Sequence, residues 1–278
     1  MRITLTIAVA LAMIVCGAAI AQDAEAPAEA AEEAAVEQDV QGGERVQEHL
    51  IALYRFDNVI EGTIIPDVTQ EFGGLDLVIQ GAVQGVPIET IELRESAVHF
   101  GSPVEMQIPG LFSADPATDI VNAIKAAGQL TLEAWITPAS EELTGPARIV
   151  SISRGSGERN ITLGQHEDTF ALRLRTSATD QQGTPALFSP EGTLRANELQ
   201  HVVATFDGQT TTIYLNGEPI VDSNHFAGTL GSWDETMHLA IGNETDGDRR
   251  WFGSVHLVAF YGYALSPAQV RMNFDAGF

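Results

Sequence analysis

The stretch that decides the fold reads HVVATFDGQTTTIYLNGEPIV and covers residues His201–Val221. Val202–Phe206 is an apolar run and Thr211–Leu215 alternates apolar with polar residues, as β-strands do. Each run is followed by a turn pair, Asp207-Gly208 and Asn216-Gly217. Asp-Gly and Asn-Gly favour tight hairpin turns because these residues tolerate a positive φ. The stretch therefore predicts an antiparallel β-meander.

Short apolar runs separated by Gly, Pro, Asn and Asp continue from residue 50 to the C-terminus. The strands that we expect are Ile51–Phe56, Leu75–Ile79, Ala97–Phe100, Leu130–Thr137, Arg148–Ser153, Asn160–Leu163, Phe170–Arg175, His201–Phe206, Thr211–Leu215, Met237–Ile241 and Val255–Tyr261. They are too many for one flat open sheet. The pattern predicts an all-β sandwich or barrel in one domain, residues 50–278.

Two segments inside this domain have helical patterns. Thr118–Ala127 places apolar residues at helical spacing and is followed by Gly128. Near the C-terminus, Ser266 and Gln269 form a capping-box pattern around Pro267, which predicts a helix to about Phe274. Both helices are short, so we expect them to be accessories to the β core.

The first 21 residues have the pattern of a secretory signal peptide. A basic residue, Arg2, precedes an apolar stretch that ends in Ala19-Ile20-Ala21, a small-x-small cleavage site before Gln22. We expect cleavage there and an exported protein, periplasmic or secreted. An uncleaved membrane anchor is the alternative, because the stretch is near spanning length. Cleavage would remove Cys16, the only cysteine, so no disulfide or thiolate site is expected.

Residues 22–49 are rich in Ala and Glu, with nine acids against one base, Arg45. Low hydrophobicity with high net charge predicts a disordered spacer, in which alanine and glutamate favour a helix, transient or formed, around Pro27–Val40. The whole chain has 14 basic and 38 acidic residues and a net charge of −24, which becomes −25 when Arg2 is lost. Such a chain is a poor partner for nucleic acid, which attracts clustered positive charge. After residue 21, no apolar run is long enough to cross a bilayer.

Five motifs resemble the LamG-like jelly rolls of the concanavalin A-like lectin/glucanase superfamily. They are Leu53-Tyr54-Arg55-Phe56-Asp57, Leu130-Thr131-Leu132-Glu133-Ala134-Trp135-Ile136, Gln200 to Gly208, Ile213-Tyr214-Leu215-Asn216-Gly217, and Trp251-Phe252-Gly253 continuing to Val270. The resemblance implies two stacked, curved antiparallel sheets and, most often, a non-catalytic module that binds carbohydrate or protein. It covers nearly all of 50–278.

The resemblance also raises the question of calcium, which many members bind. Asp57 and Asp67 match acids found early in family domains, and Asn243, Glu244, Asp246 and Asp248 gather oxygen ligands in one loop. However, Gly253-Ser254-Val255-His256 puts a histidine where the family often has an acid. A polar hairpin loop without metal is the alternative, and we expect calcium to have little effect.

We expect no enzymatic activity. Glucanases of the superfamily carry their carboxylates on one strand as a Glu-x-Asp-x-Glu type motif, and we find no such motif in this sequence. The acidic pairs Glu167-Asp168 and Asp234-Glu235 are adjacent, so a strand would point their side chains to opposite faces. The seven histidines show no metallopeptidase motif, and His201 is expected to be structural.

The predicted binding face comes from period-two alternation in Phe170–Arg175. Phe170, Leu172 and Leu174 should fill the core, so Arg173 and Arg175 should face outward. The neighbours that we expect on this face are Asn160, Glu133 and Trp135, with Trp233 and Trp251 as aromatic platforms for sugar rings. The alternatives are an ion-paired surface of purely structural value and buried tryptophans.

These residues predict an exported, non-enzymatic binding or adhesion module for a glycan or protein at the cell envelope. Two rivals remain open at this point. One is a degenerate or unrecognised glycan-active hydrolase, which would show two carboxylates about 5 to 10 Å apart in a pocket. The other is a structural accessory subunit of an envelope complex, which would show a flat apolar patch.

Overall fold

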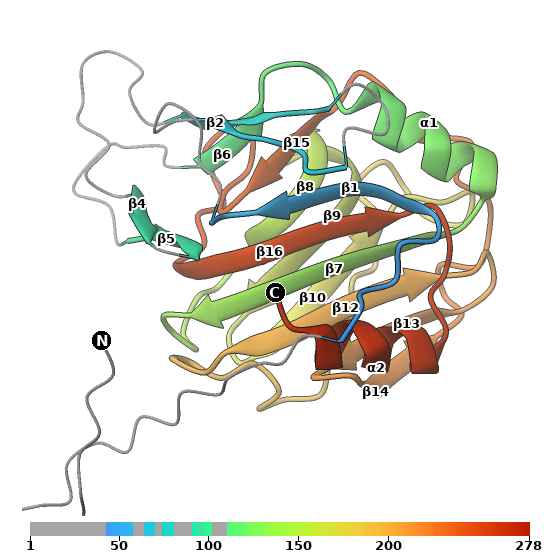
Figure 1. The fold of residues 1–278 in the computed structure, drawn as a ribbon. Coiled ribbons are helices and arrows are strands. Elements are labelled where there is room, and N and C mark those ends of the chain that lie inside the picture. The colour runs from blue at the N-terminus through green and yellow to red at the C-terminus, as the bar shows by residue number, and fades with distance from the viewer. Residues whose placement is uncertain (1–42, 58–63, 70–73, 81–90, 95, 102–109) are drawn as a thin grey trace, which may run out of the picture. The chain divides into compact units, whose positions relative to one another are not determined.

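The described residues form two antiparallel sheets that face each other across one apolar core (Figure 1). The computed structural model describes residues 43–57, 64–69, 74–80, 91–94, 96–101 and 110–278. All of them lie in one unit, Val40–Phe278. The predicted signal peptide 1–21, and the spacer as far as residue 42, lie outside the described residues. No helix in the described ranges is long and apolar enough to span a membrane.

The first sheet has the strand order β14-β13-β12-β7-β16-β5-β4, and β1 also pairs with β16. Its strands are β1 (Leu50–Arg55), β4 (Ile91–Arg94), β5 (Ala97–Phe100), β7 (Leu130–Pro138), β12 (Gln200–Phe206), β13 (Thr211–Leu215), β14 (Glu218–Ser223) and β16 (Gly253–Tyr261). The predicted meander is β12-β13-β14. At its second turn Asn216 has φ 51° and Gly217 has φ 83°, the positive values that Asn-Gly favours.

The second sheet has the strand order β11-β10-β9-β8-β15-β6-β3-β2. Its strands are β2 (Ile64–Ile65), β3 (Leu77–Gln80), β6 (Gly110–Ser113), β8 (Ala147–Gly155), β9 (Glu158–His166), β10 (Thr169–Leu174), β11 (Leu187–Phe188) and β15 (His238–Ile241). Each of the eleven predicted strand ranges corresponds to a strand of the structure, and β14 is the third strand implied by the predicted meander. We did not predict β2, β4, β6 and β11, which have only two to four residues and little room for a pattern.

Both predicted helices are present as α1 (Thr118–Ala127) and α2 (Pro267–Ala276). Gly128 ends α1 in the left-handed conformation with φ 67°. Ser266 and Gln269 form the predicted capping box at the start of α2. The sequence patterns thus located both ends of α1 and the beginning of α2, while α2 continues two residues beyond the predicted end.

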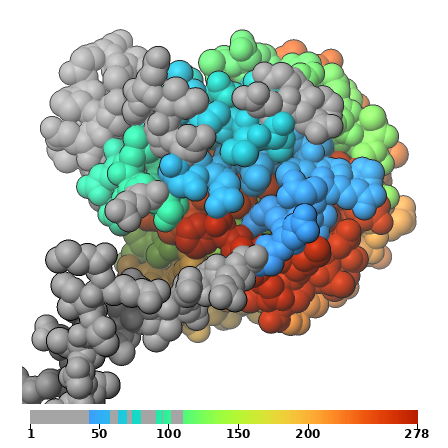
Figure 2. Space-filling view, in the orientation of Figure 1, coloured from blue at the N-terminus to red at the C-terminus, as the bar shows by residue number. Residues whose placement is uncertain are grey.

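A second apolar cluster lies on the outer face of the first sheet, beneath α2. Trp135, Val203 and Tyr261 pack there with residues of α2 and of the segment 43–49. In Figure 2 the blue N-terminal segment lies beside the red C-terminal helix on one face. This face of the sheet is therefore covered by the chain itself.

The spacer was predicted to reach His49, but Gly43–His49 lies against the domain. The backbone N–H of Val46 donates to Asn273 Oδ1 at 2.9 Å, and Val46 is buried. Arg45 Nη1 lies 2.6 Å from the Glu133 carboxylate. The prediction from composition did not include these contacts, because the partners of Arg45 and Val46 lie far along the chain.

Candidate functional site

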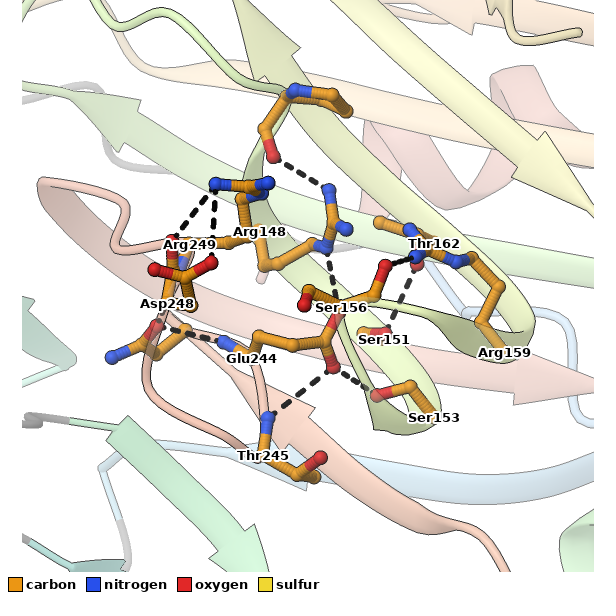
Figure 3. A network of polar contacts seen from close by, with 12 residues as sticks. Arg148, Ser151, Ser153, Ser156, Arg159, Thr162, Glu244, Thr245, Asp248 and Arg249 are labelled. Atoms are coloured by element: carbon orange, nitrogen blue, oxygen red, sulfur yellow. Dashed lines mark hydrogen bonds and ion pairs between the residues drawn. The ribbon is translucent and has the colours of Figure 1, made fainter. Parts of the chain in front are cut away.

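Polar side chains cover the outer face of the second sheet where β8, β9 and β10 run side by side (Figure 3). Strand register places Thr162 between Ser151 and Arg173, and pairs Arg159 with Ser153. Paired residues in antiparallel strands point to the same side. The neighbouring Ile152 and Ile161 point into the core instead. The alternation therefore sets a row of hydroxyl and guanidinium groups on the outer face.

Arg148 and Glu244 form a buried ion pair at the base of this face. Arg148 Nε lies 2.8 Å from Glu244 Oε2, and their side chains are 1% and 0% exposed. Arg148 Nη1 also donates to the Pro146 carbonyl at 2.6 Å, and Ser153 Oγ donates to the other oxygen of Glu244. Burial lowers the pKa of Arg148, and the Glu244 carboxylate partly offsets this effect. Both carboxylate oxygens of Glu244 are thus engaged by protein donors.

The loop that carries Glu244 is held by its own hydrogen bonds. Asn243 Oδ1 accepts the N–H of Glu244 at 2.8 Å and that of Arg249 at 3.1 Å. Asp246 Oδ2 accepts the N–H of Ser156 at 2.7 Å from the β8-β9 turn. Burial raises the pKa of Asp246, but the hydrogen bonds from the Ser156 backbone and side chain outweigh it and the pKa is lowered. These bonds fix the loop against the sheet.

Arg159 is fully buried and only partly paired. It is 0% exposed, and its Nη2 donates to the Ser156 carbonyl. Its Nε and Nη1 have no hydrogen-bond partner among the described residues. Burial, reinforced by the positive charge of Arg148, lowers the pKa of Arg159 to about 10. The side chain is therefore still a cation at neutral pH, and two of its nitrogens are unused.

Two further arginines lie near Arg159 and are partly exposed to solvent. Arg173 is half-buried, and its Nε has no partner in the described part of the chain. Burial and the charge of Arg148 lower the pKa of Arg173. Arg249 has a side chain that is 41% exposed and pairs with Asp248 at 3.4 Å. We call Arg148, Arg159, Arg173 and Arg249 the arginine cluster.

A hollow of about 880 Å³ opens on the same sheet, at its β11 edge. Phe188, which is 44% exposed, and His166 supply its aromatic lining. The other lining residues are Glu141, Glu142, Glu167, Asp168, Thr169, Ser189 and Glu191. Register aligns Phe188 with Ala171 and so with the outer face. The sequence analysis missed this hollow because β11 has only two residues.

The sequence of this chain matches the profile of a known superfamily. A family profile described as the concanavalin A-like lectin/glucanases superfamily matches residues 113–271, more than half of the chain. The chain belongs to this superfamily. Comparison with curated proteins gave no match. The resemblance found in the sequence motifs is confirmed, and so is the predicted fold of two antiparallel sheets.

Solved structures show the same fold at low sequence identity. Trypanosoma rangeli sialidase in complex with 2,3-difluorosialic acid aligns with a TM-score of 0.57 and 17% identity, over 81% of this chain and 33% of that one. The binding domain of botulinum neurotoxin DC, in complex with rat synaptotagmin II, aligns with a TM-score of 0.57 and 12% identity, over 82% of this chain and 51% of that one. The chain spans a third to a half of the length of these structures. At this identity the likeness is one of fold.

Superfamily glucanases carry their catalytic carboxylates at alternate positions on a strand, and one run of alternating acids lies in the described part of this chain. Glu244, Asp246 and Asp248 do stand at alternate positions, a spacing that the sequence analysis did not weigh as a catalytic motif. The structure places them in a loop between β15 and β16. Glu244 is bonded to Arg148, so it is neither a free acid nor a free nucleophile.

In the structure the calcium candidates make contacts within the protein. The described residues include no group of three or more His, Cys, Asp or Glu that could hold a metal ion. Asp57 pairs with Arg55 at 3.7 Å on the surface. Asp67 is buried, and its Oδ1 accepts the N–H groups of Leu53 and Thr69 at 3.0 Å each. Asp67 Oδ1 therefore connects the backbone of β1 with the turn after β2.

Glu133 and Trp135 do not share a face with Arg173, as the alternation had suggested. They lie on β7 in the first sheet, whereas Arg173 lies on β10 in the second. Trp135 is 6% exposed and stacks on Phe274 of α2, with ring centroids 5.6 Å apart. This part of the prediction is wrong because alternation shows which residues share a strand face but not which sheet the strand joins.

Glu133 is the centre of a buried polar network under α2. It is 0% exposed, lies 2.6 Å from Arg45 Nη1 and 2.9 Å from His201 Nε2, and accepts from Asn273 Nδ2 at 2.8 Å. Burial raises the pKa of Glu133, but the charge of Arg45 and the hydrogen bond and charge of His201 outweigh it and lower the pKa to about 2. This network fastens the segment 43–49 to the sheet and so has a structural role.

The remaining predicted residues lie inside the domain or at its edge. Trp233 and Trp251 are 2% and 1% exposed and belong to the core, so neither is a platform for a sugar. Their indole N–H groups donate to the Arg175 carbonyl at 2.7 Å and to Gln165 Oε1 at 2.9 Å. Asn160 bonds the backbone of Asp234 through both its amide atoms, so its side chain holds the loop that carries Trp233.

Arg175 has different surroundings from Arg173, although the sequence placed them on one face. Its Nη1 lies 3.3 Å from Glu158 Oε1, and its side chain is 19% exposed. Arg173, in contrast, belongs to the arginine cluster. The other members of that cluster, Arg148, Arg159 and Arg249, were not among the site residues predicted from the sequence. The alternation of polar Ser151 and Ser153 with apolar neighbours indicates the outward side of β8, but it does not mark Arg148 or Arg159 as buried.

Proposed function

We propose that this domain is an exported, non-enzymatic module that binds a glycan on the outer face of the second sheet. The arginine cluster carries the proposal, because Arg159 and Arg173 keep N–H donors that no described residue uses. Sugar oxygens are acceptors that such donors can bind. The exposed Phe188 ring at the β11 edge adds an apolar surface on which a sugar ring can pack.

The covered state of the other sheet supports this choice of face. On the first sheet, α2 and the segment 43–49 occupy the outer surface, and Trp135 is buried beneath them. On the second sheet, the half-buried Arg173 and Arg249 and the exposed Phe188 reach the surface. The second sheet therefore offers a ligand arginine donors and an aromatic ring at its surface.

The state of the acids supports a role in binding. Glycoside hydrolysis needs one carboxyl group as an acid and a second as a base or nucleophile. On this face Glu244 is neutralised by Arg148 and Asp246 accepts from Ser156. Export is supported by the signal-peptide pattern of residues 1–21. The fold is compatible with a glycan or a protein ligand, since similar structures were solved with a sialic acid derivative and with synaptotagmin.

A glycan array probed with the purified full-length chain tests the proposal. The variant Arg173→Ala should lose the binding of every glycan that the wild type retains, since it removes donors from the face. Arg175→Ala is the matched control, because this arginine is two residues away and pairs with Glu158. It should bind as the wild type does. Absence of any glycan binding by the wild type, or equal loss in both variants, would refute the proposal.

A further inference from the structure

We propose that the arginine cluster is a binding site for an anionic group, the carboxylate or sulfate of an acidic glycan. That the ligand is a glycan rests on the proposed function. That the bound group is an anion rests on the arginine cluster alone. Its central residue is Arg159, and Arg173 and Arg249 form its rim. Figure 3 shows Arg148, Arg159 and Arg249 around the same part of β8 and β9.

The first argument is the unused hydrogen-bonding capacity of Arg159. A guanidinium has five N–H donors, of which Nε carries one and Nη1 carries two. These three donors have no partner among the described residues, although Arg159 is 0% exposed. Buried polar groups are normally hydrogen-bonded, and a buried charge without a partner is costly. A group that accepts from these donors would remove that cost.

The second argument is the local charge. The chain has far more acids than bases, yet four arginines lie close enough on this face for Arg148, Arg173 and Arg249 each to depress the proton affinity of Arg159. Glu244 is a buried carboxylate among them, and it is bonded to Arg148. Asp248 pairs with Arg249 at the rim. Asp246 and Asp180 also lie near the cluster, so acids and arginines are equal in number. Each of these four acids bonds another group, however, and no carboxylate of the described residues pairs with Arg159, which leaves its donors for an external anion.

The third argument is access. The side chain of Arg249 is 41% exposed and Arg173 is half-buried. Arg173 and Arg249 are therefore the members of the cluster that reach solvent, whereas Arg159 and the unused Nε of Arg173 are buried. We infer that an anion binds first to these two side chains and reaches Arg159 when they move aside. Charge-assisted bonds of this kind are shorter and stronger than bonds to neutral hydroxyls.

A substitution of Arg159 should affect ligand binding and protein stability differently. Replacing Arg159 with Met removes a buried charge and three unpaired donors but keeps a long apolar side chain. Replacing a buried ionic group by an apolar one of similar volume is often neutral or stabilising. Arg159→Met should therefore keep or raise the melting temperature of the ligand-free protein while it loses anion binding. Arg148→Met should lower the melting temperature, because it leaves Glu244 buried without its partner.

The experiment uses the full-length chain and three tetrasaccharides, namely tetragalacturonate, a heparin-derived tetrasaccharide and neutral cellotetraose. Calorimetric titrations compare wild type, Arg159→Met, Arg159→Lys and the control Arg175→Ala. We expect an acidic tetrasaccharide to bind the wild type and the control variant with the same affinity. Its affinity for Arg159→Met should be at least tenfold lower.

The variant Arg159→Lys keeps the positive charge but not the planar set of N–H donors, so it should bind with intermediate affinity. It also provides the test if Arg159→Met does not fold. Whether the carboxylated or the sulfated sugar binds more tightly identifies the source of the anion.

The outcomes separate this inference from the proposed function. Binding of the neutral sugar alone, with loss in Arg173→Ala, would keep the glycan function and overturn the anion site. Stabilisation of wild type but not Arg159→Met by millimolar sulfate, with no binding of any sugar, would keep the anion site and overturn the glycan function. Equal affinity of wild type and Arg159→Met for acidic sugars would overturn the inference. So would a melting temperature of Arg159→Met as low as that of Arg148→Met, since Arg159 would then be structural.

Discussion

The buried carboxylate of Glu133 gives a prediction whose size follows from the structure. In the folded chain its pKa is lowered from 4.5 to about 2 because Arg45 and His201 outweigh the effect of burial. A carboxyl group whose folded pKa lies below its unfolded value stabilises the folded state above the unfolded pKa. This stabilisation is lost as the pH falls through the folded pKa. The difference of about 2.5 pKa units corresponds to about 3 kcal/mol above pH 4.5.

The perturbation is Glu133→Gln, which keeps the shape of the side chain and removes its charge. At pH 6 the free energy of unfolding of the variant should be about 3 kcal/mol lower than that of the wild type. This agrees with the cost of breaking a buried ion pair. As the pH falls from about 4.5 to about 2, Glu133 becomes protonated in the wild type and the difference between the two proteins should shrink towards zero. Because both proteins carry the other acids, their difference isolates Glu133.

The assay is urea unfolding followed by tryptophan fluorescence at a series of pH values, with the free energy extrapolated to water. Glu218→Gln is the matched control, because Glu218 pairs with Arg271 but its side chain is 71% exposed. Exposed pairs contribute little, so this variant should follow the wild type at every pH. A difference between Glu133→Gln and wild type that stays constant from pH 6 to pH 2 would refute the electrostatic account of this network.

Three further predictions concern other parts of the domain. Arg148→Met should destabilise the fold by about 3 to 5 kcal/mol in urea unfolding, since Glu244 would be left buried and unpaired; a loss below 1 kcal/mol would show that the pair is dispensable. Gly217→Ala should cost about 1 to 2 kcal/mol, because φ is 83° and the added Cβ would lie 2.9 Å from Cδ of Arg271, whereas Gly157→Ala, with nothing within 4 Å, should be nearly neutral. Millimolar calcium should leave the melting temperature unchanged, and a clear rise would reveal a metal site.

The elements that local chemistry determines could be predicted from the sequence. Asn216-Gly217 requires positive φ at both positions, and the Ser266 capping box needs only residues three apart, so the meander and α2 were placed correctly. The core-facing set Phe170, Leu172 and Leu174 also follows from alternation alone, and all three side chains are buried. In these cases the determining contacts lie within a few residues of one another.

The site depends on contacts between distant residues, and these could not be read from the sequence. Trp135 faces outward from β7, but only the position of α2, over 130 residues later, shows that it is covered. Glu244 meets Arg148 across 96 residues, and nothing in the local sequence marks either as buried. Arg159 was missed because a charged residue at the start of a strand is ordinarily solvated. Buried charges are the exception to the pattern, and here they carry the candidate site.

The central claim, that ligand binds on the outer face of the second sheet, is tested most directly by hydrogen exchange. Exchange of backbone amides in the full-length chain would be measured with and without the tightest-binding acidic tetrasaccharide. The account predicts slower exchange on binding in residues 147–175 and 243–249, which carry the arginine cluster, and no change in 267–276. Protection confined to α2 and β7, with none in 147–175, would contradict it.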